Sequence, residues 1–327
     1  YNRDVNGVYY INANMKEPIG SFAGADNRLR FASGTAGRIN AHVDNAIVLK
    51  NQNEGRSWTA SGSLERSLRG GLWLKTAYSY GEAKNTVDPG SIAFGSWNNN
   101  QHSNDPNNPG LGFASASPGH RVFITGSYSR EYFNFGATTV SVFWEARNGG
   151  NTSYTFGGDA NGDGGTSNDL LYVHRDTSEM NFQTFTSGGR TYTAAEQAAA
   201  WDAYIQQDDY LKDHRGEYVE RGAVFLPFVK RMDLSVSQDF FLNLKGRRHQ
   251  FQFRADVLNF GNLLNSEWGV GQRLINTQPL TNPGVDAQGR LTYRLRVVNN
   301  ELMTTSLQQT AGLTDVYRVM FSLRYTF

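Results

Sequence analysis

Carboxylate and amide side chains alternate with small residues in one loop sequence, Asp-Ala-Asn-Gly-Asp-Gly-Gly-Thr-Ser-Asn-Asp, which runs from residue 159 to residue 169. Oxygen ligands at every second position, followed by a glycine, match the opening of a calcium-binding loop, in which hard oxygen atoms converge on one cation. The candidate calcium ligands are Asp159, Asn161, Asp163, Asn168 and Asp169. Because Leu170 stands where an EF-hand has its closing glutamate, Asn168 or Asp169 would have to complete the site. The alternative is an Asx-rich turn that caps itself through side-chain to backbone hydrogen bonds.

Aromatic residues in the long loop sequences are the candidates for contacting an extracellular ligand. They are Trp97, Tyr154, Tyr172 and Trp201, together with Phe156 and Phe182. Such rings could stack on sugars or contact peptides, although loop aromatics of membrane barrels also lie at the level of the lipid headgroups. These loops carry no cluster of Lys and Arg that would select an anionic chelate. The ligand class therefore stays open between peptide, carbohydrate and metal complex.

The sequence does not favour an enzyme. Its six His are scattered, no pair has the spacing of a metalloprotease helix, and no Gly-x-Ser-x-Gly motif occurs. Asp213 and His214 are adjacent, but they follow a predicted helix and we expect them on its surface.

Strict alternation of apolar and polar residues dominates the rest of the chain and predicts β-strands with one apolar face. The last twelve residues show it best, since Tyr317, Val319 and every second residue to Phe327 are apolar. Three hairpins are predicted upstream, with strands near 58–64 and 72–80, 122–128 and 137–146, and 231–242 and 250–257. In the third hairpin we expect Asp233 or Asp239 to pair with Arg254 across the strands.

Long polar stretches separate these hairpins, near residues 82–119, 148–228 and 260–315. They far exceed ordinary connections of about 4 to 6 residues, and we expect them to be extracellular loops. The second one contains a helix signal, a capping box of Thr193 and Glu196 followed by apolar residues on one face up to Gly216. Residues 1–40 are expected to form a further extracellular loop or an incomplete strand.

Composition agrees with strands rather than membrane helices. The 327 residues include no Cys, carry a formal net charge of +1 and are 39% hydrophobic, with a mean hydropathy of −0.53. No apolar run approaches the roughly 20 residues of a membrane helix, and near-neutral charge gives no argument for nucleic acid. An aromatic content of 13% suits the aromatic girdles of a membrane barrel. We therefore predict an all-β fold, a transmembrane antiparallel β-barrel with about eight strands in this chain; a soluble sandwich is the alternative.

Several motifs, in this order, resemble the carboxy-terminal half of Oar-like TonB-dependent outer-membrane receptors. The resemblance covers most of residues 40–327, and its motifs span residues 107–112, 119–122, 151–164, 167–172, 251–260 and 317–327. It implies a 22-stranded barrel around an amino-terminal plug, energised by the TonB complex of the inner membrane. Neither a plug nor a TonB box is evident in this sequence, and no signal peptide precedes the first strand. We therefore expect residues 41–327 to be the carboxy-terminal part of such a barrel, in a mature or truncated form of a larger protein.

The favoured function is uptake across the outer membrane of a Gram-negative bacterium, with ligand capture by the extracellular loops. The alternatives are a calcium-binding adhesin or structural surface protein and, third, a barrel-embedded hydrolase. The expected partners are outer-membrane lipid, the TonB complex, the plug domain and the barrel assembly machinery; the extracellular ligand is unknown. The carboxy-terminal strand resembles the signal that this machinery reads, and its apolar members are Phe321, Leu323, Tyr325 and Phe327.

Overall fold

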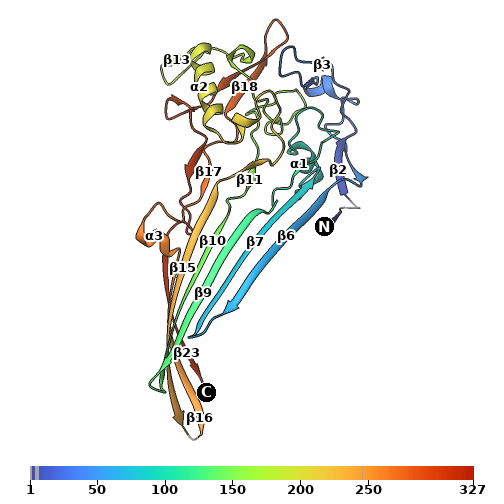
Figure 1. Ribbon diagram of the computed structural model, residues 1–327. Coiled ribbons are helices and arrows are strands. Elements are labelled where there is room, and N and C mark those ends of the chain that lie inside the picture. Colours follow the sequence, from blue (N-terminus) through green and yellow to red (C-terminus); the bar gives the residue numbers. More distant parts are fainter. Residues whose placement is uncertain (1, 4–6, 245) are drawn as a thin grey trace.

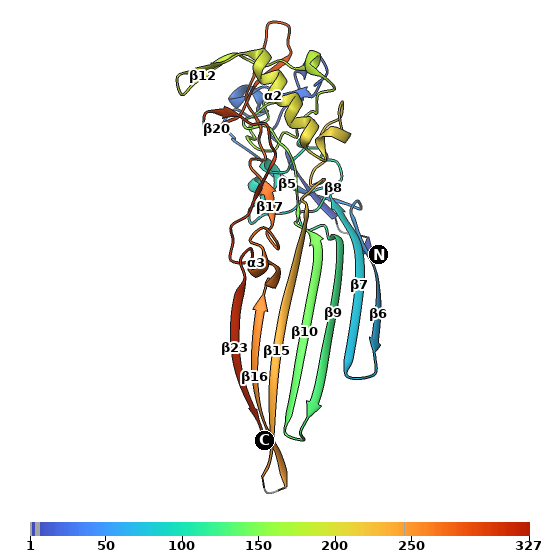
Figure 2. The same cartoon turned by 60° about the vertical axis from the view of Figure 1, so that its left-hand side comes forward.

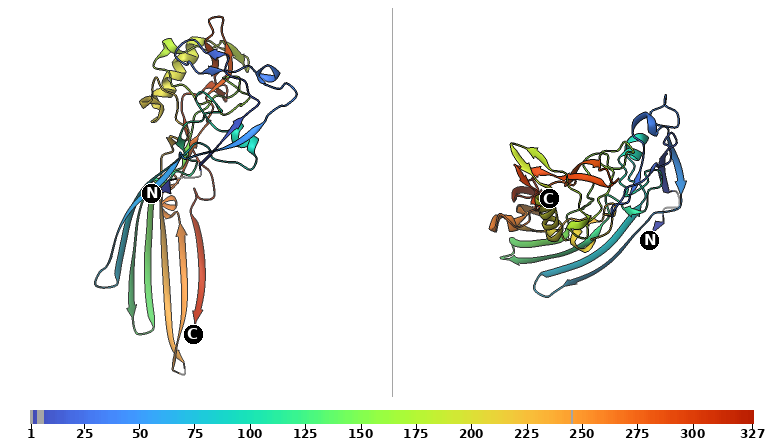
Figure 3. Two further views of the ribbon diagram at one scale, coloured as in Figure 1. Left: turned by 90° about the vertical axis from the view of Figure 1, so that its right-hand side faces the viewer. Right: turned by 90° about the horizontal axis from the view of Figure 1, so that it is seen from above.

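Seven long antiparallel strands form one curved sheet in the computed structural model, which describes residues 2–3, 7–244 and 246–327 (Figure 1, Figure 2). The long strands are β6 Arg56–Ser67, β7 Leu72–Asn85, β9 Gly119–Tyr132, β10 Gly136–Asn148, β15 Phe228–Leu244, β16 Arg247–Leu258 and β23 Arg318–Thr326. They pair in this order, with the short β1 (Asn2–Arg3) beside β6 and β8 (Gly112–Phe113) at the end of β7. The predicted all-β fold and its three hairpins are confirmed. Among the described residues β1 and β23 are the two edges, and the sheet is not closed (Figure 3).

The hairpins turn tightly at one end of the sheet, whereas all long connections leave from the other end (Figure 1). Between β6 and β7 the backbone reverses at Gly70 and Gly71, which both have positive φ. A Cβ on Gly71 would lie 2.0 Å from the carbonyl oxygen of Ser129, so only glycine fits there. In the turn between β15 and β16, Lys245 lies outside the described residues.

One face of the sheet is largely apolar along its long strands. Val142 of β10 lies opposite Gly126 and Leu234, and the adjacent row joins Val140 to Tyr128 and Val236. Large hydrophobic side chains on this face are exposed to solvent, among them Leu74, Ile124, Tyr128, Val140, Val142, Val236, Phe240, Phe251, Phe253, Val319, Phe321, Leu323 and Tyr325. The register therefore aligns the period-two pattern of each strand into one continuous surface.

The opposite face is polar, but its charges pair differently from our expectation. Arg254 binds Asp256, two residues along the same strand, at 2.7 Å. Asp239 instead accepts hydrogen bonds from Gln250 and Gln252, both at 2.9 Å. The expected pairing of Arg254 with Asp233 or Asp239 is wrong because the register places Ser237 opposite Arg254.

The long connections fold together at one end of the sheet into a structure that we call the head, residues 7–52, 86–118, 149–227 and 272–315 (Figure 1). Its main elements are β2 Gly7–Asn12, β5 Ile47–Gln52, α1 Ala93–Asn98, α2 Ala194–Gln207, β18 Leu280–Val285 and β19 Leu291–Leu295. Shorter strands are β3 Gly20–Ser21, β4 Leu29–Arg30, β11 Asn151–Thr152, β12 Phe185–Ser187, β13 Arg190–Tyr192, β14 Val224–Phe225, β17 Gln272–Leu274, β20 Val297–Val298, β21 Glu301–Leu302 and β22 Leu307–Gln309. Three 3₁₀ helices, η1 Gly34–Gly37, η2 Thr177–Glu179 and η3 Leu211–Asp213, also belong to it, while α3 Phe260–Leu264 packs beside β15. Residues 7–40, expected as a loop or incomplete strand, thus join the head, where β2 pairs with β5.

Helix α2 begins where the capping box predicted. Thr193 accepts the backbone N–H of Glu196 at 3.2 Å, and the Glu196 carboxylate accepts the N–H of Thr193 at 2.8 Å. The helix ends at Gln207, well before Gly216, because Asp208 accepts the N–H groups of Tyr210 and Leu211 and starts a separate turn.

The head has a hydrophobic core of its own, drawn from three of its segments, residues 7–52, 149–227 and 272–315. Its members with no exposed surface include Tyr154, Phe156, Leu171, Trp201, Tyr204, Ile205, Leu211 and Leu280. Long loops that bury this much apolar surface are ordered by packing. No helix in the described ranges is long and apolar enough to span a membrane.

Candidate functional site

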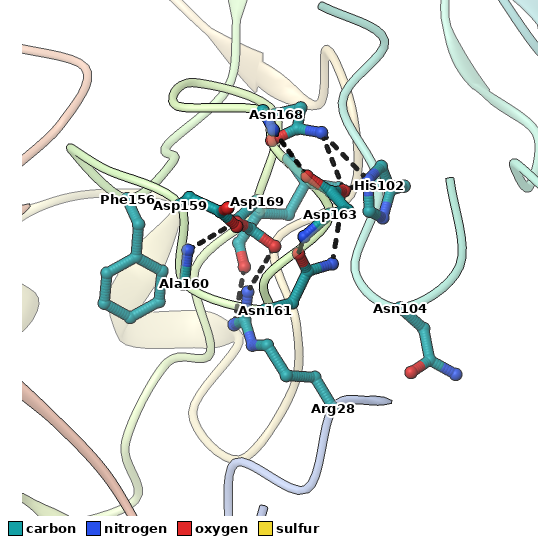
Figure 4. A network of polar contacts seen from close by, with 12 residues as sticks. Arg28, His102, Asn104, Phe156, Asp159, Ala160, Asn161, Asp163, Asn168 and Asp169 are labelled. Carbon is teal, nitrogen blue, oxygen red and sulfur yellow. Dashed lines mark hydrogen bonds and ion pairs between the residues drawn. The ribbon is translucent and has the colours of Figure 1, made fainter. Parts of the chain in front are cut away.

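The loop of residues 159–169 folds into successive turns that are capped by its own side chains (Figure 4). The carboxylate of Asp159 accepts the backbone N–H groups of Gly162 at 2.7 Å and of Gly164 at 2.9 Å. Asn161 accepts the N–H of Asp163, and Asp163 in turn accepts the N–H of Gly165 at 2.7 Å. These are the hydrogen bonds that a self-capping Asx turn requires.

Asp163 points its second carboxylate oxygen at a buried histidine from a different loop (Figure 4). That oxygen, Oδ2, lies 3.0 Å from Nε2 of His102 and accepts the amide N–H groups of Asn168 at 2.9 Å and Asn161 at 3.3 Å. Both Asp163 and His102 are buried. The contact joins the first long connection to the second, so the loop is held from outside as well as from within.

Asp169 lies in a buried ion-pair network with Arg28 and Asp26. Its carboxylate accepts the N–H of Ala160 at 2.8 Å and is 3.3 Å from the Arg28 guanidinium, which also forms two 2.9 Å hydrogen bonds with Asp26. Burial raises the pKa of Asp169 to about 6, although Arg28 acts in the opposite direction. Burial also opposes the charge of Arg28, but Asp26 and Asp169 outweigh it and hold its pKa above the ordinary value. Removing one member would leave a buried charge unpaired, so the network ties residues 26–28 to the loop.

The geometry of this loop favours the self-capped turn over a calcium site. The carboxylates of Asp159, Asp163 and Asp169 and the amide oxygen of Asn161 already accept hydrogen bonds from within the protein. Over the described ranges, no group of three or more acidic or His side chains has an arrangement that could hold a metal ion. Asn168 contributes its amide N–H group, not its oxygen, to the contact with Asp163. A calcium ion would therefore have to displace several of these hydrogen bonds.

We expect Asp163→Ala to destabilise the head equally in calcium and in EDTA. The substitution leaves the buried donors of His102 and Asn168 unsatisfied, at a cost of about 1 to 3 kcal/mol for each such group. Thermal unfolding of the purified protein, in each buffer, measures the effect, with the exposed Asp213→Ala as the control. A calcium-dependent rise in stability of the unsubstituted protein that Asp163→Ala abolishes would instead establish a calcium site.

The aromatic candidates for ligand contact are buried inside the head, and Tyr154, Phe156, Phe182 and Trp201 belong to its core. Trp97, Tyr154, Tyr172 and Trp201 are each at most 4% exposed, and Phe156 and Phe182 are buried with them. Their polar atoms bind protein partners: the Trp97 indole donates to Asn107, and the Tyr154 hydroxyl donates to Asp208 at 2.6 Å. In this arrangement these rings stabilise the head and have no surface free for stacking on a ligand. Their spacing in sequence could not reveal this, because each is buried by distant segments.

A buried histidine links helix α2 to strand β19. The indole N–H of Trp201 donates to Nδ1 of His174 at 3.1 Å, so the proton of the neutral ring resides on Nε2, which lies 2.5 Å from the Tyr293 hydroxyl. Burial lowers the pKa of His174 to about 4, because its charged form is desolvated. The ring is therefore neutral at physiological pH and connects Trp201 to Tyr293 through hydrogen bonds in the core.

This histidine predicts a pH dependence of stability. Its folded-state pKa of about 4 lies below the unfolded value of about 6.5, so its contribution is fully present above pH 6.5 and is lost as pH falls towards 4. We expect His174→Gln to be less stable than the unsubstituted protein at pH 7.5 but to lose less stability between pH 6.5 and 4. Melting temperatures across this range test the prediction, and parallel curves for the two proteins would contradict it.

The residues proposed as an assembly signal lie along the free edge of the sheet. Phe321, Leu323 and Tyr325 belong to β23 and point to the apolar face, where the Tyr325 ring stacks on Phe251 and Phe327. Phe321 is 80% exposed and Phe327 is 76% exposed. Beyond β16, β23 pairs with no other described strand, so its outer edge is available for further pairing.

Sequence analysis missed Arg28 and His102, which complete the polar network around the loop. Both lie in stretches of loop with no motif and come from connections far from residue 159, so only the fold brings them there. Comparisons with protein-family models, with curated proteins and with solved structures find no match for this chain.

Proposed function

We propose that this chain is the carboxy-terminal barrel part of a TonB-dependent receptor in the outer membrane of a Gram-negative bacterium, with the head as its extracellular ligand-capturing part. The observation that carries the proposal is the continuous apolar face formed by the seven long strands of the sheet. Soluble monomers rarely expose one contiguous apolar patch beyond a few hundred Å². Placing this face against the hydrocarbon core of a membrane removes all of its apolar side chains from water.

The polar face and the open edges support the same proposal. A barrel wall alternates lipid-facing and lumen-facing residues, and here Ser141 lies opposite Ser127 and Ser235 on the polar face directly beside the apolar row of Val142. Open edges of long strands are aggregation-prone, and closure with further strands removes them. We propose that the remaining strands of the barrel supply this closure.

The head supports ligand capture at the cell surface. Its segments all leave from one end of the sheet, as extracellular loops of a barrel do, and its separate core makes it a preorganised platform. Energised uptake through the TonB complex rests on the sequence resemblance to Oar-like receptors.

Membrane fractionation combined with surface proteolysis tests this proposal. We expect the protein in the outer-membrane fraction, resistant to carbonate extraction, with protease cleavage on intact cells confined to the head and with ligand uptake lost when the proton-motive force is collapsed. A soluble periplasmic or cytoplasmic protein would refute the membrane part. Uptake that persists without the proton-motive force would refute the energised part.

A further inference from the structure

A cavity of about 590 Å³ with a mixed polar and apolar lining lies where the head joins the sheet. Part of its wall comes from residues 90–101, which include helix α1, and another part comes from residues 151–153 and 221–222. Its volume is within the range of about 300 to 1,000 Å³ of small-molecule sites. Ser91, Ile92 and Ser115 are exposed, so the cavity opens to solvent on their side.

The wall of residues 90–101 is fixed before any ligand arrives. The buried Ser96 hydroxyl donates to the carbonyl oxygen of Ile92 at 3.0 Å and accepts the N–H of Gly90 at 2.8 Å. Trp97 anchors α1 through its hydrogen bond to Asn107, and Asn100 donates to the carbonyl of Thr86 at 2.9 Å. Preorganised walls reduce the entropy that ligand binding has to overcome.

Amide side chains supply the free hydrogen-bonding capacity of the cavity. Asn99, Asn100 and Gln101 are consecutive lining residues, and neither Asn99 nor Gln101 forms a side-chain hydrogen bond with another described residue. An amide offers both donors and an acceptor, which is the complement of a hydroxyl group that both donates and accepts. Ile92 and Phe113 add a small apolar surface suited to the C–H groups of a sugar ring.

The charge of the cavity argues against an ionic ligand. Its two charged lining residues form an ion pair, with the Arg221 guanidinium 3.3 Å from the Asp88 carboxylate. Arg221 also donates to the side-chain oxygen of Asn85 at 2.7 Å, so both of its terminal nitrogens are engaged within the protein. The lining is therefore neutral overall and does not complement an anionic chelate or a charged peptide terminus.

We propose that this cavity binds a neutral, hydroxyl-rich ligand, a short oligosaccharide, through the amides of Asn99, Asn100 and Gln101. The inference rests on the proposed function, because it names the ligand class that the head would capture. It also places recognition at the junction of head and sheet, away from the buried rings of Tyr154 and Trp201.

A glycan array probed with the purified, detergent-solubilised protein tests this inference. We expect binding to a defined set of neutral oligosaccharides, and about a tenfold weaker affinity by calorimetry for the double variant Asn99→Ala, Gln101→Ala, because about 1.4 kcal/mol is lost with its hydrogen bonds. Gln288→Ala, which removes an exposed amide from a distant turn, is the matched control and should bind normally. Thermal unfolding of each variant shows that the fold is kept.

Three outcomes would overturn the inference: no glycan bound, glycan binding that the double variant leaves unchanged, or a preference for peptides on a parallel peptide array. None of them bears on the membrane location, which fractionation measures independently. Failure of the carbohydrate site is thereby distinguished from failure of the receptor proposal.

Discussion

Val142→Arg should strongly reduce the amount of assembled protein in the outer membrane, the location we propose for this chain. Val142 lies near the middle of β10 on the apolar face and is 37% exposed in the isolated chain. An arginine facing lipid near the bilayer midplane costs about 2 to 4 kcal/mol in a barrel. Immunoblotting of membrane fractions and the heat-modifiable mobility of folded barrels in detergent gels measure the loss.

Ser141→Arg is the matched control, because it places the same side chain one residue away on the opposite, polar face. Ser127 and Ser235 flank this position, so the guanidinium finds polar neighbours there. We expect nearly normal assembly of this variant. Equal effects of the two substitutions would show that the two faces lie in similar environments. They would refute the proposal that the sheet forms part of a membrane-embedded barrel wall.

Trp201→Ala should destabilise the head by about 3 to 5 kcal/mol, the usual cost of truncating a buried aromatic side chain. The Trp201 ring has no exposed surface, stacks on Tyr204 at 5.1 Å between centroids and donates its indole N–H to His174. The substitution therefore opens a cavity and removes a buried hydrogen bond together. We expect trypsin to cleave the head at a lower temperature while the sheet stays resistant.

Trp268→Ala removes the same side chain from a site that is 55% exposed, and we expect a change within about 0.5 kcal/mol. Comparison of the two variants also separates the two roles proposed for the loop aromatics. If Trp201→Ala left protease resistance unchanged and only weakened ligand binding, Trp201 would be a ligand contact and not part of the core.

The strands could be predicted from the sequence because their determinant is local. Alternation at a period of two defines a strand and its two faces without reference to any other segment, and the structure has long strands at all seven predicted positions. The start of α2 was equally local, since a capping box joins Thr193 and Glu196 within one turn. The end of α2 could not be predicted in this way, because the side chain of Asp208 accepts the backbone N–H groups that follow it.

Long-range contacts decided the rest. The sequence of residues 159–169 is compatible with either a cation site or a self-capped turn; the arrangement of Arg28, His102 and Asn168 around its carboxylates favours the turn. In the same way, aromatic residues in polar loops are expected at the surface from sequence alone, but three distant segments of the head bury most of them in one core. Alternation and capping are determined within a few residues, whereas burial and ion pairing depend on which distant segments meet. By itself the sequence of this protein therefore determined its strands, faces and helix start, and the tertiary structure alone decided its core, its polar network and its cavity.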